Sequence, residues 1–306
     1  MRLAAFDLEI ASEIPEGVQN WRNAAPPGIS CAAVALADHE DRPLFWVGVP
    51  QMTHSECRSM VRDLQRLGTD GYTFLTWNGC GFDFAVLALE SGMYAECTEL
   101  ALNHVDLMMR VTFEKGWYLS LQKALRGAGL EGKLESVILS DGAVLSDMDG
   151  SKAPKLWAAG EHNAVLQYLR SDVVQLLRLA HVIQRRNVIR WTSDRGNPQE
   201  VFVDRLFTVR ECFDIPEPDV SWMTDPPTRE QFVRWMRLSP MSDSSPVTST
   251  IAGPSFRSGD RIRHVRFGEG VVLKSWLVGD YEEVKVIFDS VGAKRCLVSF
   301  AEMRKI

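Results

Sequence analysis

An apolar run near the start of the chain carries two carboxylates, and it constrains the fold more than any other stretch. Residues 3–10 have the sequence LAAFDLEI, which is typical of a buried strand apart from Asp7 and Glu9. Side chains two positions apart in a strand point to the same face, so these acids should lie side by side. Buried carboxylates repel each other unless a cation accompanies them. We therefore expect a divalent metal ion here, although this spacing also occurs by chance at solvated strand ends.

Two later stretches offer further acids to the same site. A turn at residues 78–81 (NGCG) follows a second apolar run, and its glycines allow the backbone to come close to a ligand. Asp83 should lie in the first turn of the next helix, where an acid also simply suits the helix dipole. Residues 161–186 show the longest helical pattern, in which Tyr168 and Asp172 are four residues apart and share a face. The alternative for this last pair is a tyrosine at the core edge beside a surface acid.

In their order and spacing, these three stretches resemble the DEDD superfamily of 3′-to-5′ exonucleases, the DnaQ-like branch of the ribonuclease H fold. The resemblance implies an α/β fold in which a mixed five-stranded sheet is flanked by helices. It also implies two Mg²⁺ or Mn²⁺ ions, held by Asp7, Glu9, Asp83 and Asp172. Tyr168 marks the tyrosine variety of the family, in which this side chain orients the attacking water. The implied reaction is two-metal hydrolysis of the phosphodiester bond at a 3′ end.

Residues near the expected metal site are candidates for substrate contact. They are Trp77, Asn78 and Phe82 around the glycine turn, and Lys133. Lys133 belongs with Lys115, Lys123 and Arg126 to the best local group of phosphate-binding candidates, although a solvated helix face explains Lys123 and Arg126 equally well. His104 and Asp106 share a face if their stretch is extended. We expect Asp106 to support the site rather than to bind metal.

Composition and charge limit the classes of protein to be considered. The net charge is −6, yet residues 256–306 hold 10 Lys and Arg against 7 Asp and Glu. An acidic nuclease remains consistent with this balance, because bound metal ions can meet the phosphate. The six cysteines form no CxxC pair, so we expect reduced core residues. No run reaches the ~18 apolar residues of a membrane span, and no signal peptide precedes the first strand, so we expect a cytoplasmic protein without membrane contact.

The end of the chain has the pattern of a separate small module. Residues 256–306 contain four or five short strands, which is typical of an SH3-like barrel. Its motifs RHxxFGxG (263–270) and VxVxFD (284–289) resemble the tudor-like carboxyl-terminal domain of UvrD-type helicases. The resemblance implies a partner such as RNA polymerase, a repair helicase or nucleic acid. We expect Phe267, Gly268 and Gly270 to be structural, and Arg263, His264 and Lys274 to be surface candidates.

We therefore expect a ribonuclease H-like domain over residues 1–238, a flexible linker over 239–255 and a tudor-like barrel over 256–306. The main hypothesis is an exonuclease that shortens single-stranded 3′ ends, with DNA favoured over RNA. Its barrel would recruit it to transcription or DNA repair complexes. A second hypothesis keeps the chemistry but makes RNA the substrate, because the metal site does not read the 2′-hydroxyl. The third is an inactive adaptor that only binds nucleic acid or RNA polymerase.

Overall fold

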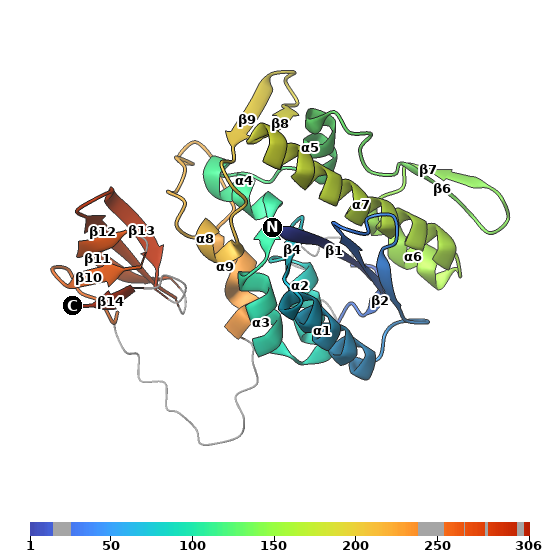
Figure 1. Cartoon of the computed structure of the whole chain (residues 1–306), viewed down its shortest axis with the longest axis horizontal. Helices are drawn as coiled ribbons and strands as arrows, with labels where there is room; N and C mark the ends of the chain where they lie inside the picture. Colours follow the sequence, from blue (N-terminus) through green and yellow to red (C-terminus); the bar gives the residue numbers. More distant parts are fainter. Residues whose placement is uncertain (15–25, 238–253, 266, 279–280, 299–302) are drawn as a thin grey trace. The chain divides into compact units, whose positions relative to one another are not determined.

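The computed structural model describes residues 1–14, 26–237, 254–265, 267–278, 281–298 and 303–306 (Figure 1). The chain forms two compact units. The first comprises residues 1–111, 118–209 and 230–239, and the second comprises residues 112–117, 210–229 and 240–306. The expected linker lies outside the described residues except for Pro254 and Ser255. The domain boundaries expected at residues 238 and 256 stay a prediction.

The first unit is built on a mixed five-stranded sheet, as expected. In sheet order its strands are β3 (Leu44–Val47), β2 (Ile29–Leu36), β1 (Arg2–Ile10), β4 (Tyr72–Thr76) and β5 (Val105–Asp106). β1 and β2 pair antiparallel, as do β2 and β3, whereas β1 and β4 pair parallel, as do β4 and β5. β1 therefore lies in the middle of the sheet, with a partner strand on either side.

The alternation of side chains along β1 divides its residues between two layers. Phe6 and Leu8 point into a core with α1 (His54–Thr69) and α2 (Asp83–Ser91), and α3 (Tyr94–Leu102) adds to that layer. The intervening residues face the long helix α7 (His162–Arg186), which crosses the sheet beside β1 and β2 (Figure 1). The period of the strand thus delivers Asp7 and Glu9 to the α7 side.

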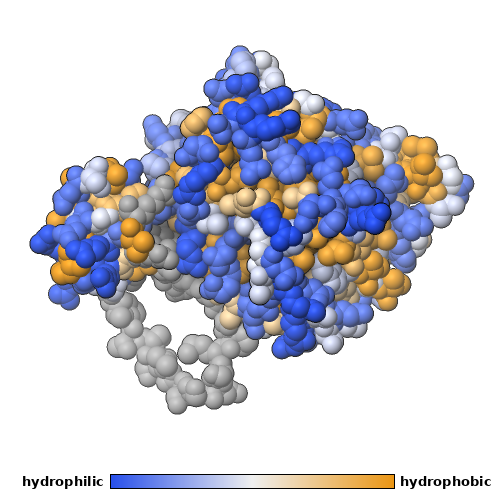
Figure 2. All heavy atoms as spheres, viewed as in Figure 1, coloured by the Kyte–Doolittle hydropathy of each residue, from blue (hydrophilic) through white to orange (hydrophobic). Residues whose placement is uncertain are grey.

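Shorter elements complete the chain up to residue 237. They are α4 (Leu107–Lys115), α5 (Leu121–Ala128), β6 (Ser136–Ile138), β7 (Val144–Ser146), η2 (Gly150–Lys152), α6 (Ala153–Ala158), β8 (Val188–Thr192), β9 (Pro198–Phe202), α8 (Val209–Cys212), α9 (Arg229–Val233) and η3 (Arg234–Arg237). Gly127 of α5 packs directly on β8, where a Cβ atom would lie 1.8 Å from the Arg190 carbonyl oxygen. The β6–β7 hairpin exposes apolar side chains, and Ile138 and Val144 are 61% and 64% exposed. Hydrophobic residues also reach the surface elsewhere on the face shown in Figure 2.

The C-terminal part of the second unit is a small β-domain, as expected. Its antiparallel sheet has the strand order β13 (Gly292–Leu297), β12 (Tyr281–Phe288), β11 (Gly268–Val278), β10 (Arg261–His264) and β14 (Met303–Lys305). Gly270 allows β11 and β12 to approach, since a Cβ atom there would lie 2.7 Å from the Ile287 carbonyl oxygen. All six cysteines of the chain are buried, and none is in a disulfide bond. Among the described residues, no helix is long and apolar enough to cross a membrane.

Candidate active site

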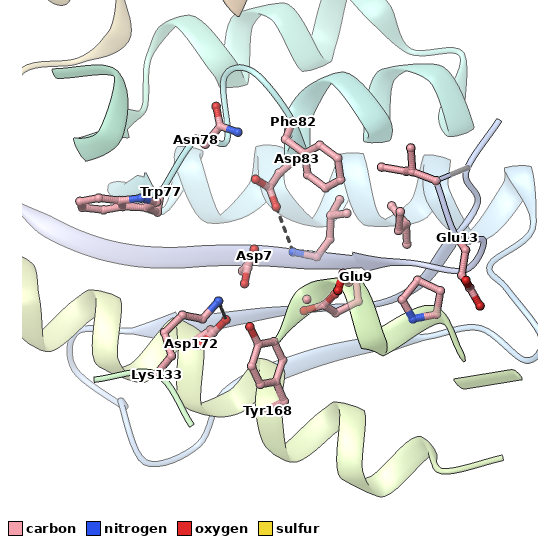
Figure 3. Close-up of a pocket in the computed structure, with 16 residues that line it drawn as sticks. Asp7, Glu9, Glu13, Trp77, Asn78, Phe82, Asp83, Lys133, Tyr168 and Asp172 are labelled. Atoms are coloured by element: carbon pink, nitrogen blue, oxygen red, sulfur yellow. Dashed lines mark hydrogen bonds and ion pairs between the residues drawn. The ribbon is translucent and has the colours of Figure 1, made fainter. Parts of the chain in front are cut away.

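Three acids from β1 and α7 converge on one point (Figure 3). Asp7, Glu9 and Asp172 each offer a carboxylate oxygen, and these oxygens all lie within 4.8 Å of one another. Glu9 and Asp172 are buried, and Asp7 is half-buried. We call these three residues the acid cluster. It arises because the strand period sends both β1 acids toward α7, and α7 turns Asp172 toward them.

Asp83, the fourth predicted acid, lies beside this cluster rather than within it. It is the first residue of α2, and its Oδ1 accepts a hydrogen bond from the backbone N–H of Leu8 at 3.0 Å (Figure 3). Its carboxyl group also contacts that of Asp7. Asp83 therefore ties α2 to the strand that carries Asp7 and Glu9.

The four buried carboxyl groups hold protons unusually tightly in the absence of a metal ion. Burial and the charge of Asp172, partly offset by Lys133, raise the pKa of Asp7 to about 7. Burial and the charge of Asp7 raise the pKa values of Glu9 and Asp83 well above the usual range. The pKa of Asp172 also rises through burial, although Lys133 opposes the increase. The site thus concentrates more negative charge than its surroundings can stabilise.

Two polar atoms of α7 are buried at the acid cluster without a hydrogen-bond partner among the described residues. They are Oδ1 of Asp172 and the hydroxyl of Tyr168. An unsatisfied buried acceptor costs about 1–3 kcal/mol, or more when it is charged. Three carboxylates, of which Asp172 has an unsatisfied oxygen, fit a hard divalent cation, because Mg²⁺ and Mn²⁺ prefer oxygen ligands. The acid cluster could therefore hold such an ion.

The Lys133 side chain reaches into the acid cluster from the loop after α5. Its Nζ lies 2.6 Å from Oδ2 of Asp172 and 4.8 Å from the centre of the Tyr168 ring (Figure 3). Burial lowers the pKa of Lys133, but the attraction of Asp172, Asp7 and Glu9 outweighs that effect and the pKa rises. Lys133 is therefore positively charged at neutral pH and offsets part of the negative charge around it.

All four predicted substrate contacts line one pocket together with the acids. Its volume is about 520 Å³, and Trp77, Asn78, Phe82 and Lys133 are on its wall with Asp7, Glu9, Asp83, Tyr168 and Asp172. The Trp77 indole is held in place because its Nε1 donates to the Leu119 carbonyl oxygen at 3.1 Å. Sequence patterns did not indicate the contribution of Gly150, Ser151 and Pro154 to this wall. Their position depends on the packing of α6 against β1, which leaves no local signal.

Asp106 supports the turn at residues 78–81, as expected. The completely buried Asp106 carboxylate accepts hydrogen bonds from the backbone N–H groups of Asn78, Cys80 and Met109, each at 3.0 Å. These bonds hold Asn78 at a φ of 73°, which few side chains other than asparagine tolerate. The neighbouring His104 ring contacts the Thr76 hydroxyl, and burial lowers the His104 pKa to about 3, so the ring is neutral.

Of the four basic residues grouped in the sequence, only Lys133 is among those that line the described pocket. Lys123 pairs with Asp194 and Arg126 with Glu135, both at 2.6 Å, and Lys115 belongs to the second unit. Lys123 and Arg126 therefore fit the alternative of a solvated face. Lys133 differs from the other three in its loop position, because Lys115, Lys123 and Arg126 belong to helices α4 and α5.

In the C-terminal β-domain, one expectation about the surface was wrong. His264 is only 4% exposed and stacks on Phe267, with ring centroids 4.6 Å apart. Alternation along β10 explains this position, because Ile262 and His264 share the inward face while Arg263 points outward. Arg263 forms an ion pair with Glu269. His264 is thus a core residue and not a surface candidate.

Comparison with known protein families matches both parts of the chain. The PcrA/UvrD tudor domain matches residues 258–305, and the RNase_H superfamily matches residues 31–184, which is half of the chain. Comparison with the curated proteins gave no match. The longer match includes Asp83, Lys133, Tyr168 and Asp172 but begins after β1, so Asp7 and Glu9 belong to the site by the strand pattern and the structure and not by this match. With its mixed sheet and this match, the chain belongs to the RNase_H superfamily.

Proposed function

We propose that the chain is a metal-dependent 3′-to-5′ exonuclease of the tyrosine-containing DEDD type, with single-stranded DNA as the favoured substrate. Membership of the RNase_H superfamily points to a nuclease, and the narrower proposal depends mainly on one observation. Three carboxylates, of which Glu9 and Asp172 are buried and Asp7 is half-buried, lie within 4.8 Å of one another in a pocket that also contains Asp83 and Tyr168. These residue types match the five positions of the DEDD pattern.

Each residue of the site has a distinct part in the proposed reaction. Asp7, Glu9 and Asp172 would hold Mg²⁺ or Mn²⁺, while Asp83 fixes β1 through the Leu8 N–H. The bound ions would polarise the scissile phosphate and lower the pKa of the attacking water. Burial raises the pKa of Tyr168, so its hydroxyl stays protonated and can orient that water but cannot act as a base. Lys133 supplies a positive charge for the phosphate.

The pocket suits the terminal nucleotide of a strand. Its volume of about 520 Å³ falls within the usual range for small-ligand sites, which is roughly 300–1,000 Å³. Trp77 and Phe82 offer aromatic faces on which an unpaired base can stack. These features favour a single-stranded end over a continuous duplex. The barrel over residues 256–306 would then provide a second contact, with RNA polymerase or a repair helicase as proposed partners.

The proposed activity can be tested with 5′-labelled single-stranded DNA and RNA whose 3′ ends are free or blocked. We expect Mg²⁺- or Mn²⁺-dependent shortening from free 3′ ends only, and loss of shortening in EDTA and in Asp7→Asn. The exposed Asp225 provides a matched control, because Asp225→Asn makes the same chemical change away from the pocket. Shortening of RNA but not DNA would support the exoribonuclease hypothesis. Absence of cleavage by the folded protein would contradict the catalytic proposal.

A further inference from the structure

Lys133 and a divalent cation would compete for the same carboxylate. Oδ2 of Asp172 lies 2.6 Å from Lys133 Nζ, and Oδ1 of Asp172 is buried without a hydrogen-bond partner among the described residues. The Asp172 carboxylate therefore belongs to the acid cluster and also pairs with the Lys133 ammonium. A divalent ion bound to the acid cluster would repel that ammonium at short range, where Coulomb energies are large.

The acids and the Lys133 ammonium belong to different kinds of structural element. Asp7 and Glu9 belong to the central strand of the sheet, and Asp172 belongs to a helix of 25 residues. Lys133 belongs to the loop between α5 and β6, and its backbone N–H donates to Oε1 of Gln122 at 2.6 Å. The backbone of Lys133 is therefore anchored, but its ammonium is at the end of four rotatable methylene groups. The acids can stay in place while this ammonium moves.

We propose that Lys133 is a built-in competitor of the metal ion: it neutralises the acid cluster in the metal-free protein and releases Asp172 when a divalent ion binds. The released ammonium then faces the same pocket as the substrate and binds the phosphate of a nucleic-acid strand. Metal binding thus frees the Lys133 ammonium to bind the nucleic-acid strand. This inference rests on the proposed function, because it takes the acid cluster as the metal site.

The test measures Mn²⁺ binding to the full-length chain by calorimetry at pH 8 in the absence of nucleic acid. We expect Lys133→Met to bind Mn²⁺ at least tenfold more tightly than the wild type, because a nearby positive charge has been removed. Lys123→Met is the matched control, since Lys123 pairs with Asp194 and does not line the pocket, and its Mn²⁺ affinity should equal that of the wild type. Asp7→Asn should lose Mn²⁺ binding at this site.

Thermal unfolding adds a readout that a purely structural role of Lys133 would not produce. The metal-free Lys133→Met protein should unfold at a lower temperature than the wild type. Saturating Mn²⁺ should raise the unfolding temperature of Lys133→Met by more than it raises that of the wild type. Lys133→Gln, which also lacks the charge, gives the same comparison if Lys133→Met does not fold. Equal or weaker Mn²⁺ binding by the charge-free variant would overturn the inference. Wild-type Mn²⁺ binding that survives Asp7→Asn would instead overturn the metal site itself.

Discussion

Asp7→Asn should stabilise the metal-free protein while it removes activity. The Asp7 carboxyl group has an ordinary pKa of 3.8, and burial raises this pKa to about 7 in the folded chain. An acid with a raised folded-state pKa favours folding at low pH, and that contribution is lost as the pH rises toward the folded-state pKa. At pH 8 the ionised Asp7 therefore opposes folding, and an uncharged amide of similar shape does not.

The size of this effect follows from the pKa difference. A difference of about 3 pKa units corresponds to about 4 kcal/mol, at 1.36 kcal/mol per unit. Relaxation of the pocket reduces this upper limit, so we expect Asp7→Asn to raise the free energy of unfolding by about 2 kcal/mol at pH 8. At pH 5 the folded wild type already holds the proton on Asp7, and the advantage of the variant should shrink to about 1 kcal/mol.

Urea unfolding of both proteins in EDTA at pH 5 and pH 8 measures this difference directly. Asp225→Asn is the control, and its stability should match that of the wild type at both pH values. Saturating Mn²⁺ should reverse the order at pH 8, because binding at 100 times the dissociation constant stabilises the folded wild type by about 2.7 kcal/mol. A variant that is less stable than the wild type in EDTA at pH 8 would refute the reasoning. A stability advantage of Asp7→Asn that does not change between pH 5 and pH 8 would also refute it.

Two further substitutions test the site and the fold. Tyr168→Phe should lower the turnover rate about 10- to 100-fold and leave Mn²⁺ affinity unchanged, because the hydroxyl is proposed to orient water rather than to bind metal; lost Mn²⁺ binding would contradict this role. Gly127→Ala should lower the free energy of unfolding by about 2 kcal/mol or more, because its Cβ would overlap the Arg190 carbonyl oxygen. Gly68→Ala in α1 is the control and should be neutral or stabilising, because a Cβ atom there would meet nothing within 4 Å. Equal losses of unfolding free energy in Gly127→Ala and Gly68→Ala would contradict the packing argument.

Local periodicity predicted which acids share a face, and the resemblance to the DEDD superfamily predicted that the two pairs meet. The two-residue spacing of Asp7 and Glu9 and the four-residue spacing of Tyr168 and Asp172 each place a pair of side chains on one face, and the structure brings three of these acids together. The hydrogen bond from the Leu8 N–H to Asp83 could not be predicted, because it depends on how closely α2 approaches β1.

Other features were missed because they depend on phase or on distant packing. His264 lies in the core of the C-terminal β-domain because side chains alternate along β10, and His264 shares the inward face with Ile262. The motif RHxxFGxG did not indicate which of its residues face inward. The sequence indicated Lys133 as a substrate-contact candidate but did not predict its ion pair with Asp172. Its loop places it against Asp172, 39 positions later in the chain, through tertiary structure alone.

The central position of β1 determines how the chain can be shortened. A fragment cut to the RNase_H superfamily match would begin at residue 31 and lack the strand that pairs with both β2 and β4. The remaining strands would be left as two separate pairs, each with unpaired backbone groups at the new edge. Such a fragment would aggregate rather than fold, and it would lack two of the three clustered acids. A fragment that keeps the fold must therefore include all of β1, from Arg2 onward.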